Sequence, residues 1–252
     1  MQPKPLNLRI REKALDLLNQ HREGLRYSEL SAKILEADPK LNSNTIRGAI
    51  WNLDNTLKND VYKPSKGLFR LLKYQSLETG NIESALPDSN DSKEKIKEKD
   101  FYVPFADWLK YEIEDVTHAI SLGGNKFRDK WGTPDVIGKY ESKRSDIINA
   151  PIEIVSAEIK TDLAHLVTAF GQACSYKLFS HKVYLVIPCQ AQNEEISRLD
   201  SLCQIFGIGL VTFNVKSVSM PDFRIRVRPY KQEPDFYYTN KYMRNIEHEL
   251  FK

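Results

Sequence analysis

Two acidic residues and a lysine in the second half of the chain have the types and spacing for metal-assisted hydrolysis. Asp135 follows a proline at the start of one apolar segment, and Glu158-Ile159-Lys160 ends the next. Because side chains alternate between the two faces of a strand, Glu158 and Lys160 must point the same way. If the two segments pair as a hairpin, Asp135 comes within metal-sharing distance of Glu158.

These groups would supply oxygen ligands to a hard divalent cation. The carboxylates of Asp135 and Glu158 and the main-chain carbonyl of Ile159 suit Mg²⁺ or Mn²⁺, with water and phosphate in the remaining positions. The metal would lower the pKa of a bound water, while Lys160 orients that water and stabilises the transition state. We therefore predict phosphodiester hydrolysis, with Asp135, Glu158 and Lys160 as catalytic residues.

Two predicted helices carry further candidates. Gln172 and Tyr176 are four positions apart on a helix predicted over residues 163–179, so they share a face. Gln172 is expected to orient metal-bound water or a phosphate and Tyr176 to contact DNA, the alternative being an ordinary half-buried helix. Glu112 lies on the apolar stripe of a helix predicted over residues 101–116, where a carboxylate destabilises the fold unless it faces a cation or donor. Glu112 is therefore a further candidate catalytic residue.

The predicted elements of residues 100–252 follow the order αβββαβαβ, which indicates an α/β sandwich with a central mixed sheet. After the helix at 101–116 we expect strands at 118–122, 135–140 and 152–160, a helix at 163–179, a strand at 183–188, a helix at 194–206 and a strand at 208–213. Near the C-terminus, Arg224, Arg226 and Arg228 alternate with apolar residues. We interpret them as an edge strand protected by charge, in preference to a phosphate-tracking strand.

Residues 1–75 predict a winged helix-turn-helix domain. Apolar spacing indicates three helices, the third with the stripe Ile46, Ile50, Leu53 and Leu57, followed by two short strands around residues 64–67. This segment has 14 Lys and Arg against 8 Asp and Glu, a net charge of +6 in a chain of net charge +3, so we expect it to bind a polyanion. The alternative is a protein-docking module with a solvated helix face. The expected DNA contacts are Arg47, Asn52, Asn55, Lys58, Lys63 and Lys66.

Two further segments have no apolar periodicity. Residues 76–99 lack apolar periodicity and predict a linker with a helical end, which sets the domains at 1–75 and 100–252. The loop at residues 123–132 is basic and aromatic, and Lys126, Arg128 and Lys130 would hold a DNA backbone there. An equally weighted alternative is a solvated loop with Trp131 tucked under the sheet.

Short motifs resemble two known families. Pro134-Asp135 with Glu158-Ile159-Lys160 resembles the signature of the PD-(D/E)XK nucleases, and Gly171-Gln172-Ala173-Cys174-Ser175-Tyr176 resembles their QxxxY motif. Residues 7–74 resemble HARE-HTH winged helices, from Leu25-Arg26-Tyr27-Ser28-Glu29-Leu30 through Thr45-Ile46 to Gly67-Leu68-Phe69-Arg70-Leu71. The resemblance implies a restriction-endonuclease-like fold and a Mg²⁺-dependent endonuclease of restriction, defence or repair. It would act on double-stranded DNA, as a homodimer because cutting both strands usually needs two centres.

Two other functions stay open. One is a DNA-binding regulator or adaptor with an inactive nuclease-like domain, and the other is a nuclease for RNA or single strands. The basic region has few aromatic residues for base stacking apart from Trp51 and Phe69, which disfavours the second. The three cysteines lack the spacing of a zinc site or a disulfide scaffold, and charges interrupt the first 18 residues. We therefore expect a cytoplasmic protein with no membrane partner.

Overall fold

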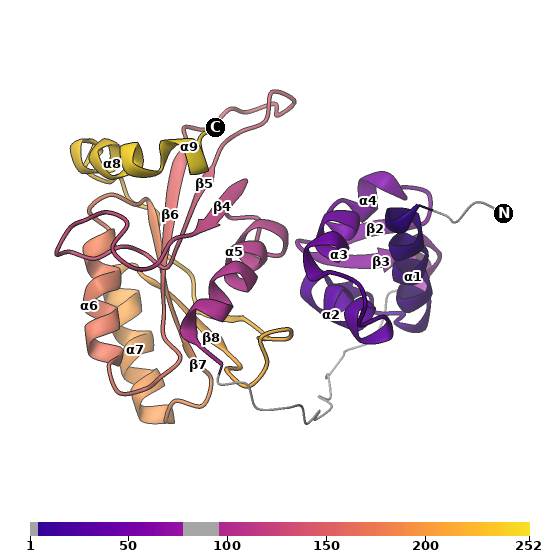
Figure 1. The fold of residues 1–252 in the computed structure, drawn as a ribbon, viewed down its shortest axis with the longest axis horizontal. Coiled ribbons are helices and arrows are strands. Elements are labelled where there is room, and N and C mark those ends of the chain that lie inside the picture. Colours follow the sequence, from indigo (N-terminus) through magenta and orange to yellow (C-terminus); the bar gives the residue numbers. More distant parts are fainter. Residues whose placement is uncertain (1–4, 78–95) are drawn as a thin grey trace. The chain divides into compact units, whose positions relative to one another are not determined.

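The computed structural model describes residues 5–77 and 96–252, which form two compact units (Figure 1). The first unit contains the described residues up to Leu77 together with Tyr111–Ile113. The second contains Ile96–Lys110 and Glu114–Lys252. Most of the predicted linker lies outside the described residues. Its two ends form the 3-10 helices η1 (Leu72–Leu77) and η2 (Glu98–Phe101).

The first unit packs helices against a three-stranded antiparallel sheet of order β1-β3-β2. Its apolar residues recur at helical spacing, and Ile10, Leu30, Ile46 and Phe69 are fully buried in one core. The elements within this unit are α1 (Leu6–Gln20), β1 (Leu25–Arg26), α2 (Tyr27–Ala37), α3 (Ser43–Ile50), α4 (Leu53–Thr56), β2 (Val61–Ser65) and β3 (Leu68–Leu71).

The prediction of one continuous third helix is wrong. Helix α3 ends at Ile50, and Asn52 leaves the helical region with φ −122° and ψ 38° before α4 begins. The Asn52 side chain accepts a hydrogen bond from the Thr56 hydroxyl at 3.1 Å, the kind of local bond that competes with helix continuation. The apolar stripe still faces the core, but Asn52 and the residues after it do not share one helix face with Arg47.

The second unit is built on a six-stranded mixed sheet of order β4-β5-β6-β7-β8-β9 within the described residues, as predicted for an α/β fold. The pairs β6–β7 and β7–β8 are parallel, and the other pairs are antiparallel. The strands are β4 (His118–Ser121), β5 (Val136–Tyr140), β6 (Glu153–Ile159), β7 (Lys182–Pro188), β8 (Gly209–Phe213) and β9 (Arg224–Val227). Strand β9 forms an edge, and Arg226 on it pairs with Asp200 at 2.6 Å, which agrees with the edge-strand interpretation.

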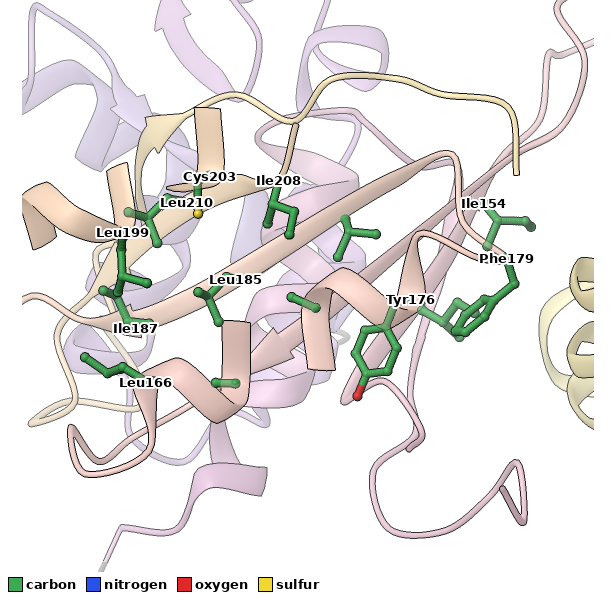
Figure 2. Close-up of a cluster of buried hydrophobic side chains, with 14 of the residues drawn as sticks. Ile154, Leu166, Tyr176, Phe179, Leu185, Ile187, Leu199, Cys203, Ile208 and Leu210 are labelled. Atoms are coloured by element: carbon green, nitrogen blue, oxygen red, sulfur yellow. The ribbon is translucent and has the colours of Figure 1, made fainter. Parts of the chain in front are cut away.

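Helices lie on both faces of this sheet (Figure 1). Helices α6 (Leu166–Tyr176) and α7 (Asn193–Phe206) cover one face, where Leu185 and Ile187 of β7 enter their apolar core (Figure 2). Tyr184, the residue before Leu185, points to the other face, where its ring meets Phe105 of α5 (Tyr102–Tyr111) with centroids 6.2 Å apart. The alternation of a strand thus builds two apolar layers.

Two helical regions differ from the prediction. The helix expected over residues 101–116 ends at Tyr111, and Glu114 adopts a positive φ of 55°, which turns the chain toward β4. At the C-terminus the structure has α8 (Phe236–Met243), η3 (Arg244–Ile246) and α9 (Glu247–Leu250), which were not predicted. None of the helices formed by residues 5–77 and 96–252 has the length and apolar character needed to cross a membrane.

Candidate active site

Asp135 and Glu158 meet where strand β5 begins and strand β6 ends. The two strands pair antiparallel with Val136 opposite Ala157, which confirms the predicted hairpin. The main-chain N–H of Asp135 donates to the Ala157 carbonyl at 3.0 Å, and that of Ile159 donates to Asp135 Oδ2 at 2.8 Å. Register and these two hydrogen bonds therefore hold Asp135 beside Glu158 across 23 positions of sequence.

Lys160 lies on the same side of β6 as Glu158, as strand alternation predicts. Its Nζ is 2.9 Å from Glu158 Oε1. The two acidic residues are almost completely buried, with 6% of Asp135 and 2% of Glu158 exposed, whereas Lys160 is half-buried. A carboxylate so far from water needs a cation or strong donors around it.

Tyr176 of α6 supplies one such donor. Its ring stands at the end of the apolar core with the hydroxyl directed away from that core (Figure 2). The hydroxyl lies 2.7 Å from Glu158 Oε2 and 3.2 Å from the Thr133 carbonyl. The expectation that Tyr176 contacts DNA is wrong, because the side chain is fully buried and its hydroxyl is engaged with Glu158.

Gln172 lies one turn before Tyr176 and borders the same loop. A methyl group built on Gly132 would be 3.4 Å from the Tyr176 hydroxyl and 3.8 Å from Gln172 Nε2. The two side chains thus share the helix face that points toward residues 132–133, as their four-residue spacing predicts.

Glu98 and Tyr102 were missed by the sequence prediction. Glu98 Oε1 is 3.4 Å from Lys160 Nζ and accepts a hydrogen bond from the Tyr102 hydroxyl at 3.2 Å. The Tyr102 hydroxyl also interacts with Asp135. The two residues are four positions apart on the helical segment η2–α5, a spacing that would have paired them had the helix been started at Glu98 and not at Phe101.

The contacts of Glu112 are with residues of the first unit. Its carboxylate accepts a hydrogen bond from the Ser28 hydroxyl at 2.8 Å and lies 3.8 Å from Arg26, contacts that belong to the first unit. Burial raises the pKa of Glu112, and the Ser28 hydrogen bond opposes that shift. Glu112 is thus a buried acid with a donor, as expected, but the helical acid that pairs with Lys160 is Glu98.

The electrostatics of the second-unit cluster favour a divalent cation. Glu98, Asp135 and Glu158 face one ammonium group, Lys160, so the formal charge is −2 when all four are ionised. Burial, and then repulsion from Glu158, raise the pKa of Asp135 to about 7. Burial also raises the pKa of Glu158, against the effect of Lys160. Two mutually repelling buried carboxylates are relieved by a cation between them.

The number of protein ligands is small. Within residues 5–77 and 96–252, no group of three or more His, Cys, Asp and Glu side chains is arranged to hold a metal ion. Asp135, Glu158 and the Ile159 carbonyl form an all-oxygen set that fits Mg²⁺, which keeps several waters and uses one or two carboxylates in phosphate-handling sites. The donor chemistry therefore fits Mg²⁺ or Mn²⁺ and does not fit a structural zinc site.

Several predicted DNA contacts are engaged within the protein. Lys126 pairs with Glu249 at 2.5 Å, and Lys66 Nζ donates to the Ile113 carbonyl at 3.1 Å within the first unit. Lys63 Nζ is 5.5 Å from the centre of the Phe69 ring. These interactions reduce the freedom of the three lysines to contact a phosphate. Asn55 and Lys58 are exposed, and Arg47 and Asn52 are half-buried.

The loop at residues 123–132 buries a different aromatic residue from the one that we expected. Phe127 is the buried aromatic residue, stacked on Tyr242 with ring centres 4.9 Å apart, while 60% of Trp131 is exposed. The interpretation that tucked Trp131 under the sheet is therefore wrong. Arg128 and Lys130 are exposed on the same loop.

Comparison with known proteins does not identify a family for this chain. No protein-family model matches this chain, and no curated protein matches its sequence. The functional interpretation therefore depends on how the fold arranges its own side chains.

Proposed function

We propose that the chain is a divalent-metal-dependent DNA endonuclease of the PD-(D/E)XK type, in which the second unit cuts and the first binds duplex DNA. The observation that carries this proposal is the convergence of Asp135, Glu158 and Lys160. Their types, order and strand positions match the nuclease signature, and the Lys160–Glu158 distance of 2.9 Å puts the ammonium at the carboxylates. The mixed sheet with helices on both faces supports a restriction-endonuclease-like fold.

Each residue of the cluster has a role that its contacts support. Asp135 and Glu158, with the Ile159 carbonyl, would hold the metal, which when bound supplies an activated water and neutralises charge on the phosphate. Burial lowers the pKa of Lys160, but Glu158 and the other carboxylates outweigh it and raise the pKa above its ordinary value. Lys160 therefore stays protonated and donates hydrogen bonds to the attacking water or to a phosphate oxygen, and does not serve as a base.

Three other side chains would position these groups. The Tyr176 hydroxyl orients Glu158, and Gln172 on the same helix face would orient water or a phosphate at the rim. Glu98 gives the Lys160 ammonium a second carboxylate partner, so Lys160 retains an ionic contact when Glu158 turns to the metal. Partners of metal ligands typically change activity about 10- to 100-fold when removed.

The element order and charge of the first unit support the proposal that it is a winged helix that binds DNA. Its order of helices followed by a β-hairpin and its net charge of +6 over residues 1–75 suit a polyanion. Arg47, Asn55 and Lys58 remain the candidate contacts, with Arg47 on α3 and the other two beyond the break at Asn52. A homodimer on DNA would bring two cutting centres to one duplex.

The second candidate function is a DNA-binding regulator whose nuclease-like domain is inactive. It predicts a damaged ligand set, whereas the acids, the lysine and their orienting tyrosine contacts are all present. This completeness favours the enzyme.

Cleavage assays separate the two functions. Purified protein is incubated with supercoiled plasmid and with linear duplex DNA in Mg²⁺, Mn²⁺ or EDTA, and DNA binding is measured in EDTA. We expect cutting with either metal, none with EDTA, and loss of cutting without loss of binding in Glu158→Ala and in Lys160→Ala. Glu194→Ala removes an exposed carboxylate paired with Arg198 on α7 and serves as the matched control. Binding without cutting by the wild type in both metals would favour the regulator.

A further inference from the structure

An exposed tryptophan beside the candidate active site has no structural role in the apolar core. The indole of Trp131 is 60% exposed, although Phe127 on the same loop is 4% exposed and completes the packing against Tyr242 and Phe179. An exposed indole is a flat aromatic surface on which a nucleic-acid base can stack.

The backbone that carries this indole is hydrogen-bonded to neighbouring side chains. The Trp131 main-chain N–H donates to Asp129 Oδ1 at 3.2 Å. The Trp131 carbonyl lies 3.2 Å from the Ser175 hydroxyl, which it shares with the Gln172 carbonyl at 2.7 Å. Asp129 is in turn held by the Tyr242 hydroxyl at 2.8 Å. A ring whose backbone is already hydrogen-bonded in the free protein has less conformational freedom to lose when it binds, which favours its use as a contact.

Ser175 connects the backbone of Trp131 to the acidic cluster. Its hydroxyl lies near the Trp131 carbonyl, and the next residue, Tyr176, donates to Glu158. Gly132, the residue after the tryptophan, has a φ of 91° and would place a methyl group 3.4 Å from the Tyr176 hydroxyl. The backbone that carries the exposed indole therefore lies next to the tyrosine that contacts Glu158.

The surroundings of the indole suit a nucleotide. Arg128 and Lys130 are exposed on the same loop, and neither has an ionic partner among the described residues. Guanidinium and ammonium groups bind phosphates, and aromatic rings stack on bases whatever their sequence. Two cationic side chains on the same loop as an exposed indole suit a phosphate next to an unstacked base, whereas the bases of an intact duplex are not open to stacking.

We propose that Trp131 stacks on an unpaired base next to the cleaved phosphate, so that the substrate of the nuclease is duplex DNA with a single-stranded overhang at the cutting site. This inference rests on the proposed function and narrows its substrate class. Trp131 acts by positioning the strand and is not one of the groups that hold the metal.

The test compares two DNA substrates of the same sequence, a blunt duplex and a duplex with a single-stranded overhang that carries 2-aminopurine. Binding is measured in Ca²⁺ by anisotropy and by quenching of 2-aminopurine fluorescence, and cleavage is measured in Mg²⁺. We expect Trp131→Ala to weaken overhang binding about tenfold, within the roughly 5- to 150-fold range of one base stacked on an aromatic ring, and to abolish the quenching. Blunt-duplex binding should change less than twofold.

Two further variants keep the result interpretable. Trp131→Phe retains a stacking ring and should keep most of the affinity, and Tyr237→Ala removes another exposed aromatic side chain, 73% exposed on α8, and should change nothing. Equal weakening of both substrates by Trp131→Ala, or no weakening, overturns the stacking role while the nuclease stands. A wild type that neither binds nor cuts any of these DNAs overturns the proposed function and the inference together.

Discussion

The Tyr176 hydroxyl donates a hydrogen bond to Glu158 Oε2 at 2.7 Å and so joins helix α6 to the end of strand β6. Glu158 thereby has a tyrosine hydroxyl on one oxygen and the Lys160 ammonium on the other. A buried carboxylate held at both oxygens has its orientation fixed before any ligand arrives, which is how surrounding residues prepare a metal site.

Tyr176→Phe should lower the rate of DNA cleavage about 10- to 100-fold, because Glu158 loses its orienting donor. Loss of the buried hydrogen bond should also lower the free energy of unfolding by about 1 kcal/mol. Cleavage kinetics and chemical denaturation measure the two effects. Tyr242→Phe removes a hydroxyl that donates to Asp129 and is the matched control for stability. Unchanged cleavage in Tyr176→Phe would contradict the orienting role.

Glu98→Gln should reduce cleavage and leave DNA binding unchanged. Glu98 lies 3.4 Å from Lys160 Nζ, and an amide gives that ammonium no second ionic partner. We expect a smaller effect than in Lys160→Ala, about tenfold, since the lysine itself remains. Glu98→Asp should recover less than half of the lost rate because its shorter side chain does not reach. A cleavage rate equal to that of the wild type would show that Glu98 does not assist Lys160.

Asp135→Asn should stabilise the metal-free protein at pH 8 while abolishing cleavage. Burial, together with Glu158, raises the pKa of Asp135 from 3.8 to about 7, so the folded protein keeps its proton to a higher pH than the unfolded chain does. Asp135 therefore destabilises the fold increasingly between pH 3.8 and 7, and fully above pH 7. Asparagine has no charge and still accepts from the Ile159 N–H.

Thermal melts in EDTA at pH 5 and pH 8 measure this effect. We expect a higher melting temperature for Asp135→Asn than for the wild type at pH 8 and a smaller difference at pH 5. Asp129→Asn should instead lower the melting temperature by a similar amount at both pH values, because the Tyr242 hydroxyl lowers the pKa of Asp129 below 3.8 and the charged form is the stabilising one. A lower melting temperature for Asp135→Asn at pH 8 would refute the repulsion between the acids.

His181 should make the second unit less stable below pH 6.5. Burial lowers the pKa of His181 in the folded protein, and its Nδ1 accepts a hydrogen bond from the Ile154 N–H at 2.9 Å. As the pH falls below 6.5, His181 is protonated in the unfolded chain before it is protonated in the folded protein. The stability contributed by neutral His181 is therefore complete above pH 6.5 and is lost as the pH falls toward the folded pKa. His181→Asn keeps an acceptor and should flatten the change in melting temperature between pH 7.5 and 5.5. If the change in melting temperature with pH is the same in His181→Asn and the wild type, another group causes the pH dependence.

The parts of the site that the sequence predicted are those fixed by strand geometry. Alternation sets Glu158 and Lys160 on one side of a strand, and pairing of two successive apolar segments brings Asp135 to them. Glu98 escaped because it lies at the end of a polar segment without apolar periodicity, where a helix start has no signal. Neither alternation nor periodicity applies to a loop, so the sequence could not tell that Phe127 is buried and Trp131 exposed.

The same limits explain the errors in the fold. Apolar spacing continues across Asn52, so the break between α3 and α4 depends on a local side-chain hydrogen bond that periodicity does not register. Helix α8 has mostly tyrosine and polar residues, a composition that does not distinguish a helix from a loop without knowledge of its packing against Phe127. Glu112 follows the apolar stripe of its helix, but its carboxylate meets Ser28 and not the acidic cluster.

Binding of Mn²⁺ tests the central claim most directly. Electron paramagnetic resonance follows the loss of the free Mn²⁺ signal as protein is added, without DNA or cleavage. We predict one Mn²⁺ per wild-type chain, with affinity rising from pH 6 to pH 8 as Asp135, whose pKa is about 7, loses its proton. Binding should be at least tenfold weaker in Asp135→Asn and in Glu158→Gln. Equal Mn²⁺ binding by the wild type and both variants would show that Asp135 and Glu158 do not hold a metal.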